Sequence, residues 1–364
     1  MKLIAQVKLL PTEQQADTLR HTMELANELC NYLSGHAWDR KAFRQYDLHK
    51  LAYRDARDEF PELSSQIVVR CIARVADAYK LDRKAKRKFR PLSAITYDDR
   101  ILSWYTDKQA VSIWTTAGRA KIQFACGDRQ RELLHCRQGQ SDLILCKGTW
   151  YLHAVCNVEE AGPCDASGFL GIDLGIVNLA TDSDGEIYPG DVIEEKRRTY
   201  SHRRHNLQRK GTKSAKRKLR DLSGKQASFQ KTENHRISKC IVTKAKDTNR
   251  AIAVENLTGI RQRITVRKRQ RARHANWSFY QLKQFLSYKA RLAGIPIVEV
   301  DPRHTSQACS VCGCVNRSNR RTQASFSCTS CGFSASADVN AAVNIAARAA
   351  STSQTVPVTK VSAP

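Results

Sequence analysis

The sequence predicts an α/β protein whose 364 residues are enough for two or three domains. Three observations carry this prediction. Short β-prone runs occupy residues 2–10 and 93–160, on either side of a helical pattern at 11–90. Further along, three apolar runs each end in an acidic residue, as buried strands of one sheet would. Near the C-terminus, four cysteines form two CxxC pairs, which predicts a small metal-binding module.

The N-terminal part combines a small sheet with helices. Thr12 and Gln15 have the spacing of a capping box, so a helix is expected to begin directly after the first strand. A second helix is predicted through residues 65–75, ahead of a basic stretch at 83–90. Glycine-separated runs at 93–160 predict an antiparallel sheet or barrel. The strand at 2–10 is expected to join it, which would make the helices an insertion.

The charge balance predicts a polyanionic partner. Sixty-one Lys and Arg residues against 35 Asp and Glu leave a net charge of +26. Phosphates attract such an excess because neutralising them releases counterions. A membrane surface is the rival polyanion, but no stretch of 18 apolar residues and no hydrophobic signal after Met1 is present. Nucleic acid is therefore the favoured partner, with no membrane.

Two runs concentrate this charge. Residues 196–225 hold 13 Lys and Arg and one acid, Asp221, and residues 261–273 hold seven more Lys and Arg and no acid. Such runs can be solvated faces or tails. The first lies between predicted core strands, which favours a helical segment that faces phosphates. The predicted nucleic-acid-binding residues are Arg83, Lys84, Lys86, Arg87, Lys88, Arg197, Arg198, Arg203, Arg204, Arg209, Lys210, Lys216, Arg217, Lys218, Arg220, Arg267, Lys268, Arg269 and Arg271.

The two CxxC pairs predict a zinc ribbon. Thirteen cysteines, an odd number, without a signal peptide predict reduced thiols in a cytosolic protein rather than disulfides. Fifteen residues separate the pairs, a spacing at which each knuckle gives two thiolates to a tetrahedral Zn²⁺. Gly313 and Gly332 follow the knuckles and permit the tight turns around a metal. Cys314 is expected to be a bystander. The predicted ligands are Cys309, Cys312, Cys328 and Cys331.

The strand-end acids predict a second metal site. The apolar runs end at Asp173, Glu255 and Asp301, and another acid, Asp338, follows the second knuckle. Any one of them can be a solvated acid at a strand end. Together, carboxylates at one sheet edge would repel each other, and hard oxygen ligands select Mg²⁺ or Mn²⁺. Two such ions can clamp the attacking water and the leaving oxygen of a phosphodiester. These considerations leave the choice between Asp301 and Asp338 open.

Short motifs follow one another in a specific order. They are KLLPT at 8–12, GIDLG at 171–175 with LAT at 179–181, VENL at 254–257, DPRHTSQ at 301–307 and DVNAAVNI at 338–345. This set resembles TnpB, the RNA-guided nuclease of insertion sequences and a relative of type V CRISPR effectors. The motifs around Asp173, Glu255 and Asp338 resemble the three RuvC motifs of that family.

The resemblance implies an α/β RNase H-like (RuvC) nuclease core with an inserted zinc ribbon. It makes Asp173, Glu255 and Asp338 the catalytic ligands of Mg²⁺ (or Mn²⁺) and leaves Asp301 a structural role. One departure is visible, because Ala337 stands where the family often has a basic residue, after Ser336 where an acid is common. The implied domains are a β-rich wedge module (1–10 and 91–163), a helical recognition domain (11–90), the nuclease domain (164–305 and 333–350), the zinc ribbon (306–332) and a disordered tail (351–364).

The function implied by the resemblance is RNA-guided DNA cleavage. A guide RNA from the transposon end would pair with double-stranded target DNA next to a short adjacent motif, and the chain would act as a monomer with its RNA in the prokaryotic cytoplasm. Two alternatives share the architecture. One is a DNA transposase, or an accessory transposition protein, that acts on transposon ends. The other is a nuclease-inactive RNA-guided repressor, which would be expected to lack one of the acids.

Overall fold

The structure, a computed structural model, describes residues 1–258 and 279–355. The chain divides after Glu159 into two compact units. Among the helices of the described residues, none is both long and apolar enough to cross a membrane. Part of the predicted basic surface, namely Arg267, Lys268, Arg269 and Arg271, lies outside the described residues.

The N-terminal unit contains a seven-stranded antiparallel sheet in the order β2-β6-β7-β1-β5-β4-β3. Its first strand lies between β7 and β5, as the sequence predicted. Four residues, 98–101, join β2 to β3 at opposite ends of this order, and such a link spans at most about 18 Å. Seven flat strands would separate them by about 29 Å, so the sheet must curl toward a barrel. The strands are β1 Lys2–Leu10, β2 Ile95–Tyr97, β3 Leu102–Tyr105, β4 Ala110–Thr115, β5 Gly118–Ala125, β6 Arg137–Cys146 and β7 Thr149–Asn157.

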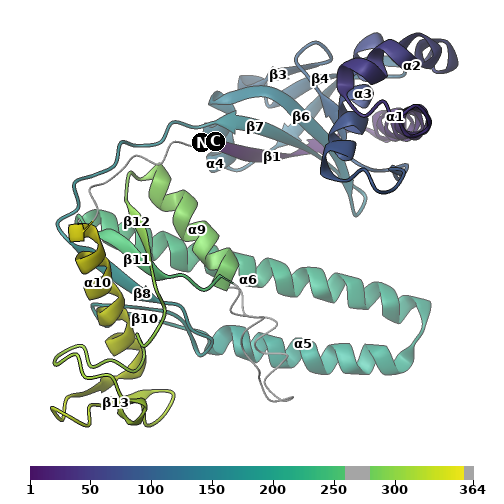
Figure 1. The fold of residues 1–364 in the computed structure, drawn as a ribbon. Coiled ribbons are helices and arrows are strands. Elements are labelled where there is room, and N and C mark those ends of the chain that lie inside the picture. The colour runs from purple at the N-terminus through teal and green to yellow at the C-terminus, as the bar shows by residue number, and fades with distance from the viewer. Residues whose placement is uncertain (259–278, 356–364) are drawn as a thin grey trace. The chain divides into compact units, whose positions relative to one another are not determined.

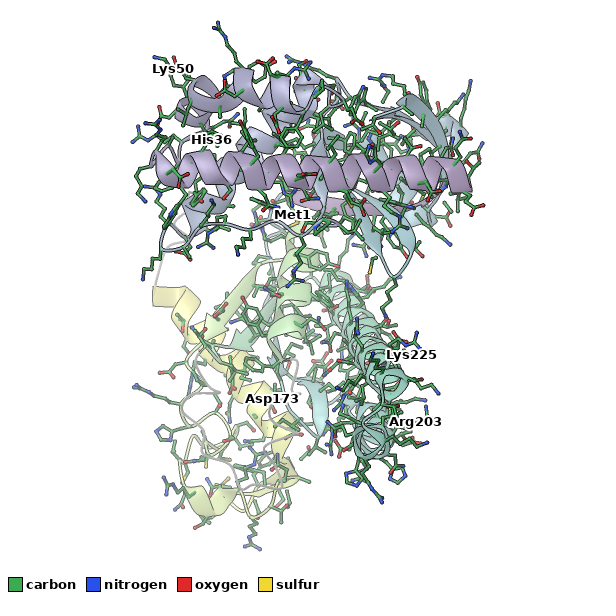
Figure 2. All side chains as sticks on the ribbon, turned by 90° about the vertical axis from the view of Figure 1, so that its right-hand side faces the viewer. Met1, His36, Lys50, Asp173, Arg203 and Lys225 are labelled. Carbon is green, nitrogen blue, oxygen red and sulfur yellow. The ribbon has the colours of Figure 1, made fainter. Side chains whose placement is uncertain are left out.

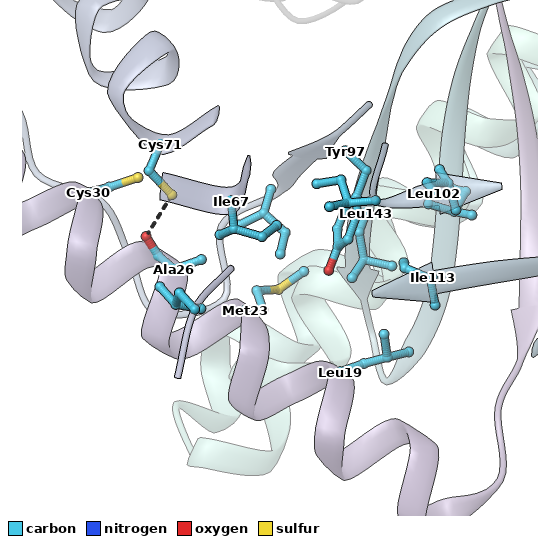
Figure 3. Close-up of a cluster of buried hydrophobic side chains, with 14 of the residues drawn as sticks. Leu19, Met23, Ala26, Cys30, Ile67, Cys71, Tyr97, Leu102, Ile113 and Leu143 are labelled. Atoms are coloured by element: carbon cyan, nitrogen blue, oxygen red, sulfur yellow. Dashed lines mark hydrogen bonds between the residues drawn. The ribbon is translucent and has the colours of Figure 1, made fainter. Parts of the chain in front are cut away.

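Helices fill the predicted insertion between β1 and β2. Thr12 and Gln15 form both halves of the predicted capping box at the start of the first helix. The apolar stripe of that helix, from Leu19 to Cys30, packs with Ile67 and with Tyr97 of the sheet in one core (Figure 3). The helices are α1 Glu13–Asp39, α2 Gln45–Glu59 and α3 Ser65–Leu81, and a short helix, α4 Asp128–His135, and the turn η1 Thr106–Lys108 lie later in the unit.

The C-terminal unit is built on a five-stranded sheet in the order β10-β9-β8-β11-β12. The three strands predicted to end in acids are β8, β11 and β12; they run parallel. Strands β9 and β10 form a hairpin with Gly185 in its turn at φ +92°. Gly185 permits this left-handed turn at little cost. The strands are β8 Phe169–Asp173, β9 Asn178–Asp182, β10 Ile187–Pro189, β11 Ala251–Glu255 and β12 Ile297–Val300.

Helices cover both faces of this sheet. Side chains such as Ile172 and Val254 pack with Ile241 of α6 and Leu286 of α9 on one face. On the other face, Ala253 and its neighbours pack against α10. The helices of this unit are α5 Asp191–Lys210, α6 Lys213–Asp247, α9 Phe279–Leu292 and α10 Ala337–Thr355, and the smaller elements are η2 Arg317–Asn319, β13 Ser325–Ser327 and β14 Ser334–Ser336.

The basic run at 196–225 is helical, as predicted. It forms most of α5 and the first part of α6, which lie side by side as a long hairpin closed at Gly211 (Figure 1). Arg203 of α5 and Lys225 of α6 are exposed on this hairpin (Figure 2). Because α5 buries no side chain, its surface is available to a partner.

The last helix extends into the predicted tail. A disordered tail was expected at 351–364, but α10 continues to Thr355. Alanine favours helix propagation, and the hydroxyls of Ser351 and Thr352 each donate to the carbonyl four residues earlier. These bonds satisfy the polar groups within the helix. The prediction of a disordered tail is therefore wrong for residues 351–355. Residues 356–364 lie outside the described part of the chain.

Candidate active site and four-cysteine cluster

Three acids lie at the ends of neighbouring elements. Asp173 ends β8 and Glu255 ends β11, and the two strands are adjacent and parallel, with Ile172 opposite Val254. Parallel strands bring their carboxyl ends to the same sheet edge. Asp338 is the second residue of α10, the helix that packs on β8. The positive end of a helix dipole helps keep such an acid ionised.

A glycine lets this helix approach the sheet. A Cβ at Gly171 would lie 2.0 Å from the carbonyl oxygen of Ala342 and 2.7 Å from the backbone nitrogen of Ala346. No side chain fits at such distances, so the backbones of β8 and α10 touch at this point. Ala342 is one helical turn after Asp338, and Gly171 is two residues before Asp173. The glycine of the GIDLG motif thereby brings the two acids toward one another.

The three acids influence one another electrostatically. Burial, followed by the charges of Glu255 and Asp338, raises the pKa of Asp173 to about 7. Burial also raises the pKa of Glu255, against a hydrogen bond from Thr305 that lowers it. Among the described residues, no side chain donates a hydrogen bond to the Asp173 carboxylate. Within residues 1–258 and 279–355, this carboxylate therefore has no direct side-chain partner.

Asp338 has two polar neighbours. Asn178, the first residue of β9, donates from Nδ2 to one carboxylate oxygen at 2.8 Å. The guanidinium of Arg320 lies 3.4 Å from the other oxygen and also donates to the carbonyl of Gln323. Arg320 comes from the segment between the two cysteine pairs and supplies the cation that Ala337 does not. Neither Asn178 nor Arg320 was among the site residues predicted from the sequence.

Asp301 has different surroundings from Asp338. Its carboxylate accepts a hydrogen bond from the backbone nitrogen of Arg303 at 3.0 Å and is 57% exposed, so it shapes the turn after β12. Its charge contributes to the raised pKa of Glu255. The pKa of Asp173, by contrast, responds to Asp338. The turn at Asp301 begins the segment that leads into the first cysteine pair.

The donor set of Asp173, Glu255 and Asp338 fits a hard divalent cation. All three offer carboxylate oxygens, the ligands that Mg²⁺ and Mn²⁺ prefer. A raised pKa caused by burial and by like charges shows that the ionised form lacks compensation at Asp173. Among the described residues, the guanidinium of Arg320 acts on Asp173 and those of Arg348 and Arg320 act on Glu255, and they offset the raised pKa values only in part. A cation bound among these acids would supply the missing positive charge.

The four predicted cysteines form a cluster. Among the described residues, the sulfurs of Cys309, Cys312, Cys328 and Cys331 all lie within 4.8 Å of one another. The Sγ atoms of Cys309 and Cys331 are 3.7 Å apart, and those of Cys312 and Cys328 are 3.6 Å apart. Four thiols at these separations suit a tetrahedral ion, and the cluster suggests zinc.

The two knuckles have the same backbone turn. Gly313 donates to the carbonyl of Cys309 and Gly332 to that of Cys328, at 2.9 and 3.1 Å, with φ values of +74° and +75°. The predicted role of both glycines is confirmed, because this left-handed backbone favours a residue without Cβ. Cys314 contributes its carbonyl to the first turn, accepting from the nitrogen of Cys309. Its sulfur is not part of the cluster.

The predicted basic residues separate into paired and unpaired side chains. A carboxylate oxygen of Glu194 lies 2.6 Å from a guanidinium nitrogen of Arg197 and 3.3 Å from one of Arg198. Asp82 pairs with Arg87. Arg204 donates to the amide oxygen of Gln226. The exposed basic side chains with no carboxylate partner among the described residues are Arg83, Lys84, Lys86, Lys88, Arg203, Arg209, Lys210, Lys216, Arg217, Lys218 and Arg220.

A solved structure has a similar fold. The structure matches the chain in "Cryo-EM structure of the Cas12f1-sgRNA-target DNA complex" with a TM-score of 0.62 and 16% identity, over 92% of this chain and 83% of that chain. At this identity the likeness concerns the fold alone. That protein is solved with a guide RNA and target DNA.

Sequence comparison identifies the family. Residues 153–261 match the OrfB_IS605 family, described as "Probable transposase", and residues 279–345 match the family "Cas12f1-like, TNB domain". A TnpB-like protein of Methanocaldococcus jannaschii is 31% identical over 51% of this chain and 71% of its own length. The chain therefore belongs to the TnpB family.

Another relative is a nuclease by name. "CRISPR-associated endodeoxyribonuclease Cas12f1" of Sulfoacidibacillus thermotolerans is 38% identical over 218 residues, which are 55% of this chain and 50% of that protein. The chain thus matches about half the length of this relative.

Proposed function

We propose that this protein is an RNA-guided DNA endonuclease of the TnpB type, with Asp173, Glu255 and Asp338 as its catalytic metal ligands. The observation that carries the proposal is the shared electrostatic environment of these acids. Burial and the charges of Glu255 and Asp338 raise the pKa of Asp173, the charge of Arg320 offsets this only in part, and no side chain among the described residues donates a hydrogen bond to Asp173. An uncompensated group of carboxylates beside β8 fits a RuvC-type centre that binds Mg²⁺ or Mn²⁺.

Each residue then has a distinct task. Asp173, Glu255 and Asp338 hold the ions. Asn178 orients the carboxylate of Asp338, and Arg320 places a guanidinium where a phosphate oxygen could approach. When bound, two divalent ions would lower the pKa of a water and neutralise charge on the scissile phosphate in phosphodiester hydrolysis. The four-cysteine cluster would hold one Zn²⁺ with no open position for chemistry.

Sequence selection would belong to the RNA. A guide RNA from the transposon end would pair with double-stranded target DNA beside a short adjacent motif, and the protein, a monomer on its RNA, would hold the hybrid through its backbone. Several exposed cations of the α5/α6 hairpin, such as Arg203 and Arg217, have no carboxylate partner among the described residues and suit such contacts. The domain boundaries implied by the resemblance belong to this proposal, with 11–90 as the recognition domain, except that α10 continues to Thr355.

Guide dependence tests the proposal. The protein is purified from cells that express it with its flanking transposon end, and the RNA that copurifies is sequenced. The complex is then given a guide of new sequence, a matching DNA target and Mg²⁺. We expect cleavage of the matching target alone, next to an adjacent motif. Cleavage of transposon ends by RNA-free protein would instead support a transposase, and guided binding without cleavage would support a repressor.

A further inference from the structure

Thr305 makes a contact that the proposed function leaves unused. It is 2% exposed, and its hydroxyl donates to the carboxylate of Glu255, 50 residues earlier in the chain. The same hydroxyl oxygen lies 3.0 Å from the carbonyl of Pro302. A threonine hydroxyl has a single proton, and an ionised carboxylate is a stronger acceptor than a carbonyl. The bond to Glu255 is therefore the favoured one.

Asn344 on α10 holds the backbone of Thr305 in place. Its Nδ2 donates to the carbonyl of Thr305 at 2.9 Å and to that of Ala308 at 2.8 Å. One turn earlier on the same helix, Asn340 donates to Ala308 at 2.8 Å and accepts from the nitrogen of Ser310 at 3.0 Å. Two asparagines four residues apart lie on one helix face. Together they fix the segment that enters the first cysteine knuckle.

These contacts form a continuous path between two of the acids. Asp338 and Asn344 are on the same helix, Asn344 holds Thr305, and Thr305 holds Glu255. The segment that follows Thr305 is also held at its far end by the knuckle that begins at Cys309. A rotation of the Glu255 carboxylate would break the bond to Thr305. A shift of the loop would break the bonds to α10.

We propose that Thr305 is a positioning residue that orients Glu255 toward a bound cation, and that Asn344 ties this orientation to the helix carrying Asp338. The inference rests on the proposed function, since it assumes that Glu255 is a ligand. The hydroxyl engages one carboxylate oxygen of Glu255, and no described residue bonds the other, which is therefore open to the ion. Partners of this kind change metal affinity or activity by about 10–100-fold when they are removed.

The experiment measures binding of Mn²⁺ alone to the full-length protein by electron paramagnetic resonance, beside cleavage in the guided complex. Thr305→Val removes the hydroxyl and keeps the shape, and Thr305→Ser keeps the hydroxyl. Thr322→Val is the matched control, because Thr322 lies in the same region and its hydroxyl accepts from Ser325 instead. Zinc content and melting temperature report whether each variant is folded.

We expect Thr305→Val to weaken Mn²⁺ binding and cleavage by about 10–100-fold, with zinc content unchanged, and Thr305→Ser to restore both. Asn344→Ala, which leaves the hydroxyl in place, should weaken Mn²⁺ binding by a smaller factor, and Thr322→Val should bind as wild type does. Wild-type Mn²⁺ affinity in both Thr305→Val and Asn344→Ala, or no recovery in Thr305→Ser, would overturn the inference. Failure of the wild type itself to bind Mn²⁺ and to cleave would reject the proposed function instead.

Discussion

Two groups of three carboxylates lie in the C-terminal unit, and their charges are balanced in opposite ways. In the first group, Arg320 and Arg348 only partly offset the charges of Asp173, Glu255 and Asp338, and the pKa of Asp173 rises to about 7. The second group, which we call the hairpin acids, consists of Asp182, Asp184 and Glu186 around the turn between β9 and β10.

The hairpin acids have cations of their own. Lys244 of α6 lies 2.5 Å from Asp182 and 3.2 Å from each of Asp184 and Glu186. Arg250 donates to both oxygens of Asp184, at 2.8 and 2.6 Å. The bonds from Arg250, and then from Lys244, lower the pKa of Asp184 to about 2.

The contrast teaches how to separate a structural ion network from a candidate metal site. Both groups are clusters of acids, so their composition does not distinguish them. The hairpin acids attach α6 to the edge of the sheet through direct ion pairs with Lys244 and Arg250. Among the described residues Asp173 has no such pair, and burial and like charges raise its pKa, so an added cation would stabilise its ionised form. The following predictions test this difference, beginning with the largest effect.

The largest effect is expected at the uncompensated acids. Asp173→Ala, Glu255→Ala or Asp338→Ala should each reduce cleavage by about a thousandfold or more, because a lost metal ion removes several kcal/mol of charge stabilisation. RNA-dependent binding of target DNA should remain. Nicking assays in Mg²⁺ beside binding assays measure both. The Asp301→Ala variant should still cleave DNA. An inactive Asp301→Ala variant together with an active Asp338→Ala variant would mean that the third acid is misassigned.

Gly171 provides a geometric test of the same group. Gly171→Ala should push α10 away from β8, because the added Cβ would meet the backbone of Ala342 at 2.0 Å. We expect a loss of about 1–3 kcal/mol in the free energy of unfolding and reduced cleavage. Gly168→Ala is the matched control, because a Cβ there meets nothing within 4 Å. Equal stability of the two variants would contradict the close approach.

The four cysteines form a third group. As thiolates they would carry negative charge, which zinc should balance. Metal analysis should find about one zinc per chain, since four ligands complete a tetrahedral site. Cys309→Ser should lower zinc content and stability, because a ligand is lost from the cluster. Cys314→Ser should do neither. Zinc lost from Cys314→Ser but retained in Cys309→Ser would refute the ligand assignment.

The hairpin acids should matter for stability rather than for cleavage. Lys244→Met leaves the fully buried Asp182 without its cation, and we expect a loss of about 2–3 kcal/mol, below the usual range for a broken buried pair because backbone N–H groups still bond Asp182. Lys246→Met, on the exposed side of the same helix, should cost little. Urea unfolding measures both. A cleavage defect in Lys244→Met without a loss of stability would show that this group has another role.

The smallest effects concern the exposed cations of the α5/α6 hairpin. Replacing Arg217, Lys218 and Arg220 together with alanine should weaken guide RNA binding, and each lost phosphate contact should lower the salt slope of log affinity by about 0.7–0.9. The preferred target sequence should not change. Arg197→Ala should alter the slope less, because Glu194 already neutralises Arg197. Identical slopes for wild type and the triple variant would indicate a merely solvated face.

Sequence periodicity and spacing were sufficient for the local features. Strands that end in acids, the knuckle glycines and the capping box at Thr12 each depend on residues within a few positions of one another. The CxxC spacing likewise identified the four cysteines that cluster. The length of α10 was underestimated because Ser351 and Thr352 resemble a tail in composition, although their hydroxyls bond within the helix.

The partners of the acids could not be predicted in the same way. Arg320 is 18 residues from Asp338, Asn178 is 160 residues away, and Thr305 is 50 residues from Glu255. Nothing in the local pattern of these residues indicates which acid they meet. Their contacts depend on how α10 and the cysteine segment pack against the sheet. The balance of charge that separates the two groups of acids is therefore visible only in the structure.

Mn²⁺ binding tests the central claim most directly. The number and affinity of Mn²⁺ ions bound by the full-length protein would be measured by electron paramagnetic resonance for wild type, Asp173→Asn, Asp338→Asn and Asp184→Asn. We predict that Asp173→Asn and Asp338→Asn lose the tightest binding and that Asp184→Asn keeps it, because Arg250 and Lys244 already neutralise Asp184. Wild-type binding by Asp173→Asn and Asp338→Asn, or its loss in Asp184→Asn alone, would contradict the account.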